Sequence, residues 1–376
     1  MKVTKLPRSG AFFIVFVLLT ATAAKAKAEY TFTLIADSAG LFRDSGFASP
    51  SLNATGTVAI FAFLDNGRFG IFTGNGGTTT TVTLNPMQLG GYGAPSINQA
   101  GTVAFSETQG NAIRPQRIVS GNGGPLTTIA DTVGEFGGFS EGYSTAINSA
   151  GTVAFWAVPD TGPAGIFASS GGTVTPLFVN SVSLGAPNNF AFNDAGTLAF
   201  RKSTATGIVT VNGGLITTIV DNSGPLNYFG AAPSLNETGT VAFVAGINGR
   251  DGITSGIYKG NGGPLTTIAD LSGPFSAFNG FDSFEPSINA SGTVAFSAGL
   301  DAGGGGVFIG DGIVTSKVVG VGDSLFGSIV TGAGVSPHSL NDSGQVAFTY
   351  TLANGIRGIA IANPVPEPSP ALLLAL

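Results

Sequence analysis

NETGTVAF, at Asn236–Phe243, is one of seven copies of an eight-residue phrase that recurs along this chain of 376 residues. The copies begin about 48 residues apart on average, a period typical of repeat architectures. The other six are NATGTVAI at Asn53–Ile60, NQAGTVAF at Asn98–Phe105, NSAGTVAF at Asn148–Phe155, NDAGTLAF at Asn193–Phe200, NASGTVAF at Asn289–Phe296 and NDSGQVAF at Asn341–Phe348. This recurrence predicts a fold built from seven equivalent units.

Each phrase has the composition of a tight turn followed by a β-strand. Asn is favoured at the first position of a type I turn and Gly at the fourth, so NxxG predicts a hairpin connection. Side chains alternate along the strand that follows, which places Val and Phe on one face and Thr and Ala on the other. We therefore expect a structural role for the seven turn asparagines, Asn53, Asn98, Asn148, Asn193, Asn236, Asn289 and Asn341.

Three further pieces complete each unit. A short apolar segment precedes the phrase, as in EPSIN from Glu285, and a strand-like piece with a Gly-rich turn follows it, as in GIYKGNGG from Gly256. The last piece reads PLTTIAD from Pro264. The Asn-Gly pairs of the Gly-rich turns are expected to supply the positive φ angles of a tight hairpin. These pairs begin at Asn75, Asn122, Asn212 and Asn261.

Four short strands per unit and seven units favour an all-β fold, a seven-bladed β-propeller of four-stranded antiparallel blades around a channel. An open β-solenoid or a string of small sandwiches are the alternatives. YTFTLIAD from Tyr30 matches the fourth-strand piece with no phrase before it, whereas the last unit stops after GIRGIAIA from Gly355. We therefore predict that the N-terminal strand completes the last blade, which removes exposed sheet edges.

The two faces of each GTVAF strand predict how neighbouring blades pack. A face that carries Phe would meet the small Ala face of the next sheet, which keeps the interior dense. Truncation of one such ring, Phe243 or Phe296, to Ala is expected to cost about 3 to 5 kcal/mol if the ring is buried.

Residues 1–28 have the pattern of an export signal. A basic start from Lys2 to Arg8 precedes a short apolar stretch, and Ala26 and Ala28 are the small residues of a predicted cleavage site. Cleavage removes five positive charges and no negative ones, so the formal charge changes from -6 to -11. We expect neither nucleic-acid binding by so acidic a chain nor a membrane span within it.

The absence of cysteine excludes disulfides and thiolate sites, and the single His338 cannot form the histidine clusters of zinc or copper centres. The sequence therefore assigns no catalytic, cofactor-binding or metal residues. A ring of acidic residues after the fourth-strand pieces could bind calcium, because hard cations prefer oxygen ligands. We favour ordinary turn formation for this ring, which comprises Asp37, Asp131, Asp221, Asp270 and Asp323.

Two single residues also have alternative interpretations. Trp156 follows Phe155 and should lie on the opposite face, where partial burial between blades is favoured over stacking on a sugar ring. For His338, a structural role is favoured over acid–base chemistry, which would need a partner that the sequence does not identify.

The tandem phrases resemble those of bacterial exported proteins with NxxGxxAF repeats and a C-terminal anchor. The resemblance covers Tyr30 to about Asn363, and only Ile60 departs from the pattern. It implies a repeat architecture and export, and it provides no catalytic residues.

The C-terminus is similar to the PEP-CTERM sorting signal, which opens with VPEPSP as this chain does from Val365 through Pro366, Glu367 and Pro368. That resemblance implies processing by a membrane enzyme of the exosortase type. The sequence stops at Leu376, before the apolar helix and basic cluster of the signal, and a truncated end is expected. Three segments result: a signal peptide at 1–28, the repeat propeller at 29–363 and the start of the sorting segment at 364–376.

These observations favour an exported, non-catalytic repeat protein of a Gram-negative envelope or extracellular matrix that binds or scaffolds surface material such as polysaccharide. The alternative is a polysaccharide-active enzyme that uses carboxylates at the channel mouth, since glycoside hydrolysis requires only two suitably spaced carboxyl groups. A purely structural matrix protein is a third interpretation.

Overall fold

The computed structural model describes residues 29–43, 47–85, 90–109, 116–139, 145–179, 189–202, 204–249, 252–278 and 285–366. Ala28–Pro366 forms one compact unit, and the regular elements in its described part are all β-strands. Within these ranges no helix is long and apolar enough to cross a membrane. The predicted signal peptide with Ala26 and Ala28, and the sorting residues Glu367 and Pro368, lie outside the described residues.

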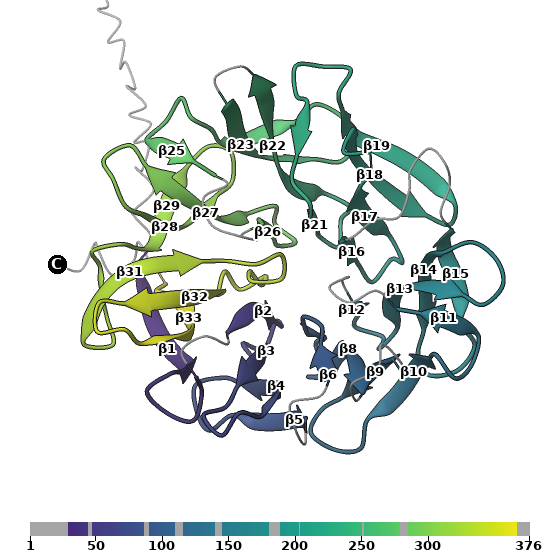
Figure 1. Cartoon of the computed structure of the whole chain (residues 1–376). Coiled ribbons are helices and arrows are strands. Elements are labelled where there is room, and N and C mark those ends of the chain that lie inside the picture. Colours follow the sequence, from purple (N-terminus) through teal and green to yellow (C-terminus); the bar gives the residue numbers. More distant parts are fainter. Residues whose placement is uncertain are drawn as a thin grey trace, which may run out of the picture. The chain divides into compact units, whose positions relative to one another are not determined.

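Seven antiparallel sheets, arranged in a ring, form the blades of a β-propeller (Figure 1). Residues of blades 1 to 5 and of blade 7 line a central cavity, and we call the space between the inner strands the channel. Blade 1 contains β2 (Ala48–Leu52), β3 (Val58–Phe63), β4 (Phe69–Gly74) and β5 (Thr80–Leu84). Blade 2 contains β6 (Gly90–Tyr92), β7 (Ser96–Ile97), β8 (Val103–Gln109), β9 (Gln116–Gly121) and β10 (Thr127–Asp131). Blade 3 contains β11 (Phe136–Gly138), β12 (Thr145–Ile147), β13 (Val153–Pro159), β14 (Gly165–Ser169) and β15 (Thr175–Val179). Blade 4 contains β16 (Phe190–Phe192), β17 (Leu198–Arg201), β18 (Gly207–Asn212) and β19 (Leu215–Asp221).

Blade 5 contains β20 (Tyr228–Phe229), β21 (Ser234–Leu235), β22 (Val241–Gly249), β23 (Gly252–Gly260) and β24 (Thr266–Ala269). Blade 6 contains β25 (Phe275–Ala277), β26 (Ser287–Ile288), β27 (Val294–Leu300), β28 (Gly305–Gly310) and β29 (Thr315–Gly320). Blade 7 contains β30 (Ser324–Leu325), β31 (Ser328–Gly334), β32 (Val346–Leu352), β33 (Arg357–Pro364) and β1 (Tyr30–Asp37). In blades 2, 3, 5 and 6 the inner strand consists of two short pieces that pair with the same second strand, so each blade keeps four strand positions.

The ring closes through the N-terminal strand, as the sequence predicts. β1 pairs antiparallel with β33, from Tyr30 opposite Pro364 to Asp37 opposite Gly358. In Figure 1 the purple β1 lies beside the yellow β33, so the two ends of the described chain share one sheet. The prediction of a closed propeller is therefore confirmed.

The NxxG turns connect the first and second strands in all seven blades. In blade 5 the Gly239 N–H donates to the Asn236 carbonyl at 3.1 Å, and the Asn236 N–H donates to the Thr240 carbonyl at 3.0 Å. The seven turn glycines have φ between +77° and +83°, a region that glycine enters without the steric cost of a Cβ. Each turn is thus a short hairpin loop with glycine in the left-handed position.

The Gly-rich turns between the third and fourth strands differ in one respect from the expectation. In the Asn-Gly pairs only the glycine has a positive φ, for example +99° at Gly262. A Cβ at Gly262 would lie 2.9 Å from Thr217 Cγ2 of the preceding blade. Glycine is required there because of both the backbone conformation and the close approach of the neighbouring sheet.

Seven hydrophobic clusters lie at the seven junctions between blades. At the junction of blades 5 and 6, Ala242 packs in one cluster with Val294 and Phe296. The same pairing of an Ala face with the Val and Phe face of the next blade recurs around the ring, with Ile60 in place of Phe in blade 1. Phe296 is 0% exposed, which confirms the predicted packing. Trp156 is 9% exposed and packs between blades 3 and 4, on the face opposite Phe155.

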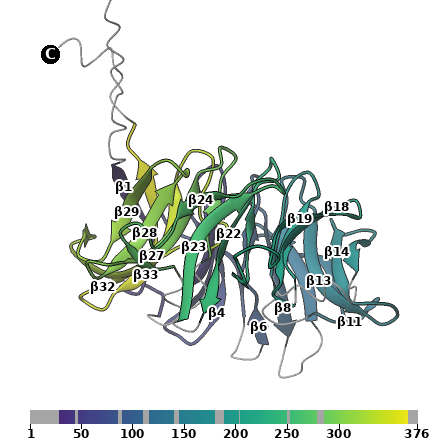
Figure 2. The same ribbon diagram turned by 90° about the horizontal axis from the view of Figure 1, so that it is seen from above.

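The strands run between two rims of the propeller (Figure 2). We call the rim that carries the seven NxxG turns the Asn rim. The turns between the second and third strands of each blade, such as the one from Leu64 to Arg68, lie on the opposite rim. β33 ends on the Asn rim, because Ala362 pairs with Val346, the residue that begins β32 beside the Asn341 turn.

Candidate functional site

The turn asparagines form a hydrogen-bonded ring around the channel. In each turn the side-chain oxygen accepts the backbone N–H four residues later, at 2.8 to 3.0 Å. The side-chain amide of six of them donates to the carbonyl of the asparagine in the next blade, at 3.0 to 3.3 Å. The bond from Asn341 Nδ2 to the Asn53 carbonyl, 3.0 Å long, joins blade 7 to blade 1.

A second set of bonds between blades involves the serines that lie two residues before four of the asparagines. Ser234 Oγ accepts the Ile288 N–H at 3.2 Å, and Ser287 Oγ accepts the Leu340 N–H at 3.0 Å. Ser51 and Ser96 accept the corresponding N–H groups of the blades that follow them. Among the described strands, those of adjacent blades do not pair through their backbones. These side chain-to-backbone bonds therefore link the inner strands of adjacent blades.

The residues that follow the asparagines add acidic groups at the mouth of the channel on the Asn rim. Asp194 Oδ1 accepts the Ser149 N–H at 2.7 Å, Glu237 Oε2 accepts the Asp194 N–H at 2.9 Å, and Asp342 Oδ1 accepts the Ala290 N–H at 2.8 Å. Gln99 Oε1 accepts the Ala54 N–H at 3.0 Å in the same manner. The described residues contain no group of three or more His, Asp or Glu side chains that could hold a metal ion.

The electrostatics of this mouth centre on Glu237. Partial burial raises the pKa of the Glu237 carboxyl, and the Asp194 N–H that it accepts opposes this effect. The negative charges of Asp194 and Asp342 raise its pKa further. Burial and like charges together thus favour the protonated form of Glu237.

The loop between β31 and β32 enters the channel and carries His338. Ser336 Oγ donates to the Pro50 carbonyl at 2.7 Å, Ser234 Oγ donates to the Pro337 carbonyl at 2.9 Å, and the Leu52 N–H donates to the His338 carbonyl at 2.8 Å. The loop of blade 7 therefore contacts blades 1 and 5 across the channel.

His338 lines a channel cavity of about 150 Å³ together with Asn98, Asn148, Asp194 and Glu237. Its side chain is half-buried, and burial among surrounding protein atoms lowers the pKa of the imidazole, which favours the neutral form. A second cavity of about 130 Å³, between Gln99, Glu237 and Asp342, lies at the Asn rim. The channel thus has a polar lining, with carboxylates concentrated at one mouth.

The acidic residues that the sequence singles out lie away from the channel, at the ends of the outer strands. Asp131 Oδ1 accepts the N–H groups of Val133 and Gly134, at 3.0 and 2.9 Å. Asp37, Asp221 and Asp270 cap their own turns in the same way. Asp323 binds the Gly320 N–H and the Lys317 ammonium. These carboxylates therefore act in turn formation.

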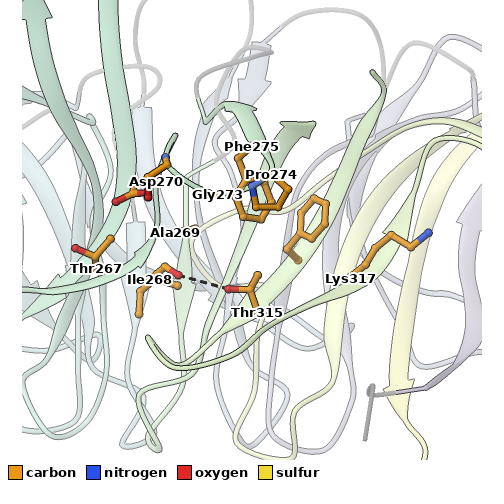
Figure 3. A pocket seen from close by; sticks show the side chains of 11 residues that line it. Thr267, Ile268, Ala269, Asp270, Gly273, Pro274, Phe275, Thr315 and Lys317 are labelled. Atoms are coloured by element: carbon orange, nitrogen blue, oxygen red, sulfur yellow. Dashed lines mark hydrogen bonds between the residues drawn. The ribbon is translucent and has the colours of Figure 1, made fainter. Parts of the chain in front are cut away.

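A groove of about 390 Å³ lies on the outside of the propeller, between β24 of blade 5 and β29 of blade 6 (Figure 3). Its floor is apolar, formed by Phe275 and Phe308, whose rings lie 5.1 Å apart. Both rings are about 5% exposed, so they offer edges and little face to a ligand. The Thr315 hydroxyl donates to the Ile268 carbonyl at 3.5 Å across the groove, a contact between blades 5 and 6.

The sequence prediction treats the seven asparagines as turn residues, and it missed two features of this geometry. It did not identify the amide bonds between blades, nor the residues that follow Asn in the phrase, Gln99, Asp194, Glu237 and Asp342. The amide bonds had a signal in the sequence, because every copy of the phrase uses Asn. Asp or Ser would also cap the turn, but neither has the amide donor that these bonds require.

Comparisons with known proteins agree with the fold and go no further. A family profile with the description "Family of unknown function (DUF7453)" matches residues 203–333, less than half of the chain. No curated protein matches the sequence.

Among solved structures, the chain is similar to an oligogalacturonate lyase from Vibrio parahaemolyticus, with 13% identity and a TM-score of 0.56 over 91% of this chain and 99% of the lyase. It is also similar to a puromycin-hydrolysing peptidase from Mycobacterium tuberculosis, with 13% identity and a TM-score of 0.54 over 87% of this chain and 54% of the peptidase. A GH74 xyloglucanase from Xanthomonas campestris matches with 12% identity and a TM-score of 0.48 over 87% of this chain and 53% of the xyloglucanase. The chain spans about half the length of the last two proteins, and at these identities the likeness concerns the fold alone.

Proposed function

We propose that this protein is an exported, non-catalytic propeller that binds or scaffolds surface material such as polysaccharide at the bacterial envelope. One observation carries the proposal: the carboxylates at the channel mouth, Asp194, Glu237 and Asp342, each accept a backbone N–H of the preceding blade. A carboxylate that holds a neighbouring blade contributes to the architecture of the ring, whereas a catalytic acid or base must be directed at the substrate.

The rim on which the described chain begins and ends would set the orientation of a propeller displayed on a surface. The Val365 N–H donates to the Glu29 carbonyl at 2.8 Å, so both ends leave blade 7 together on the Asn rim. If the sorting motif at Pro366, Glu367 and Pro368 is processed by an enzyme of the exosortase type, the Asn rim faces the anchor. The opposite rim then faces the surroundings.

The alternative function is that of a polysaccharide-active enzyme at the same mouth. The pKa of Glu237, raised by burial and by two neighbouring carboxylates, is the observation that favours it, because a raised pKa is typical of a general acid. His338 lines the same cavity as Asp194 and Glu237.

A binding screen and a turnover assay separate the two functions. The purified chain is applied to an array of defined oligosaccharides with and without calcium, and each bound glycan is then incubated with the protein and analysed by mass spectrometry. The proposal predicts that a glycan is retained intact. Cleavage that is lost in Glu237→Gln would establish the enzyme instead, and a chain that binds no glycan would contradict the proposal.

A further inference from the structure

Blade 1 departs from the other blades in where it places its aromatic side chains. Its phrase has Ile60 at the core position that Phe occupies in the other six, and Ile60 is 0% exposed. Phe61 and Phe63 instead lie on the other face of β3, which is directed at blade 2, and both rings are half-buried. At the position of Phe61 the other blades have no Phe; they have Ser106, Trp156, Arg201, Val244, Ser297 and Thr349. Blade 1 thus has a smaller apolar side chain at this core position and two partly accessible Phe rings on the other face of β3.

These rings belong to a chain of aromatic contacts that we call the aromatic cluster, formed by Phe61, Phe63, Phe69, Tyr92 and Phe105. Phe61 lies 5.2 Å from Phe63, and Phe63 lies 5.4 Å from Phe69. Tyr92 lies 5.5 Å from Phe69 and 5.4 Å from the fully buried Phe105. The cluster therefore extends from the core of the blade 1–blade 2 junction to its surface, which gives the outer rings a rigid support.

Charged groups surround the partly accessible end of the cluster. Arg117 forms an ion pair with Glu107, and Arg68 Nε donates to the Asn85 carbonyl at 3.3 Å. The Tyr92 hydroxyl lies 3.4 Å from Thr83 Oγ1. Burial raises the pKa of the Tyr92 hydroxyl. Tyr92 lies opposite Glu107 in the β6–β8 ladder, and Glu107 lies opposite Arg117 in the β8–β9 ladder. Arg68 directly precedes Phe69 of the cluster. Glu107 offsets the charge of Arg117, so the Arg68 guanidinium is the positive charge of these three groups that lies outside an ion pair with Glu107.

This combination has a definite chemistry. Aromatic faces contact the C–H groups of pyranose rings, and guanidinium groups bind carboxylates through paired N–H donors. A sugar acid, which joins an apolar C–H face to a carboxylate, matches both parts of the surface.

The site also lies on the rim that the proposed function requires. β3 begins beside the Asn53 turn and runs away from the Asn rim, so Phe63, its last residue, and Arg68, after the next turn, lie on the opposite rim. The described chain ends at Pro366 on the Asn rim, and the cluster is therefore on the side away from the C-terminal exit.

We infer that the outer part of the aromatic cluster, with Arg68 and Arg117, is a binding site for acidic oligosaccharides that contain uronic acid residues. This inference rests on the proposed glycan-binding function and names its ligand class and its site. The sugar faces lie on Phe61, Phe63 and Tyr92, and a uronate carboxylate pairs with the Arg68 guanidinium beside the Arg117–Glu107 ion pair.

The test compares a β-1,4-linked mannuronate tetrasaccharide with the neutral β-1,4-mannotetraose, which differ only in the oxidation state of C6. Isothermal titration is performed at two salt concentrations, alongside the oligosaccharide array, on the original chain and on Phe63→Ala and Arg68→Gln. Phe326→Ala, an exposed ring of blade 7, and Arg357→Gln, an exposed arginine of β33, are the matched controls. Urea unfolding of every variant confirms that it is folded.

The inference predicts that uronate-containing glycans bind at least tenfold more tightly than their neutral counterparts. Added salt should lower the affinity for the uronate-containing glycans. Phe63→Ala and Arg68→Gln should each reduce this affinity tenfold or more, while the controls leave it unchanged. Glycan binding that is unaffected by both variants would overturn the site but leave the proposed function intact. A preference for neutral glycans, lost in Phe63→Ala but kept in Arg68→Gln, would overturn the ligand class. If no glycan binds to the original chain, both the inference and the proposed function are wrong.

Discussion

Replacement of Asn236 by Asp isolates the bond between blades from the turn cap. The side-chain oxygen of Asn236 accepts N–H groups of Thr238 and Thr240 at 3.1 and 2.8 Å, and Asp can keep both bonds. The amide of Asn236 donates to the Asn289 carbonyl at 3.0 Å, and a carboxylate cannot make this bond. The variant Asn236→Asp therefore removes the amide donor that links blade 5 to blade 6 and leaves the turn intact.

The magnitude follows from what remains at the Asn289 carbonyl. That oxygen still accepts the Gly292 N–H at 3.0 Å, so it is not left without a partner. It now faces a carboxylate oxygen at about hydrogen-bond distance in a site where Asn236 is only 5% exposed. The variant loses a buried hydrogen bond and gains repulsion between the Asp carboxylate and the Asn289 carbonyl oxygen. The bonds from the Thr238 and Thr240 N–H groups become charge-assisted, which offsets part of this cost. We expect a net destabilisation of about 1 to 3 kcal/mol.

Urea unfolding monitored by the fluorescence of Trp156, which is buried between blades 3 and 4, measures this cost. Asn66→Asp is the matched control, because Asn66 is exposed and its side-chain oxygen caps a turn by accepting the Arg68 N–H at 3.1 Å. The control should change the free energy of unfolding by less than about 0.5 kcal/mol. If Asn236→Asp is as stable as Asn66→Asp, the amide ring does not hold the blades together.

Two further predictions concern the core and the channel. Phe296→Ala should destabilise the protein by about 3 to 5 kcal/mol in urea unfolding, because the ring is 0% exposed and packs between blades 5 and 6. Phe326→Ala, whose ring is 40% exposed, should cost much less. Equal costs would contradict the packing of Phe against the Ala face. Burial lowers the pKa of His338, so as the pH falls below about 6.5 the unfolded chain takes up the proton before the folded one, and the stability that neutral His338 contributes above that pH is lost. His338→Gln should remove this part of the pH dependence below about pH 6.5, and identical pH profiles of the two proteins would refute the assignment.

The local rules that act within one unit could be read from the sequence. NxxG predicts the turn because Asn236 and Gly239 suit the first and fourth positions, and the alternation in GTVAF predicts that Ala242 and Phe243 lie on opposite faces. The closure of the ring also followed, because the strand at Tyr30–Asp37 has no phrase of its own. The turn and strand inferences use residues that are neighbours in the chain, and closure follows from comparing the incomplete units at the two ends of the repeat array.

The features that depend on contacts between units were not accessible in this way. The carbonyl that Asn236 binds belongs to Asn289, and only the curvature of the ring brings the two residues together. The splitting of the inner strands was also missed, although Pro95 and Pro286 precede β7 and β26 and lack the N–H that a continuous ladder needs. The entry of His338 into the channel depends on contacts with blades 1 and 5, which no local pattern encodes.

The candidate site could be predicted only in part. The seven asparagines were identified, but as turn residues alone. The aromatic cluster was not, although the exchange of Phe for Ile60 and the added Phe61 and Phe63 mark blade 1 as different in the sequence itself. Recognising it required the distance from Tyr92 to Phe69 and Phe105, which joins two blades.

A cross-link between the two ends of the described chain tests the closed ring most directly. Thr31 lies opposite Asn363 in the β1–β33 ladder, and the chain contains no cysteine, so Thr31→Cys with Asn363→Cys introduces a single defined pair. Mild oxidation should give one intramolecular disulfide, identified by peptide mapping, and a more stable protein. The control pair Thr217→Cys with Asn363→Cys lies on an outer strand of blade 4 and on blade 7, and it should not form a disulfide. Failure of the first pair to cross-link in the folded protein, or equal cross-linking of both pairs, would contradict closure by β1.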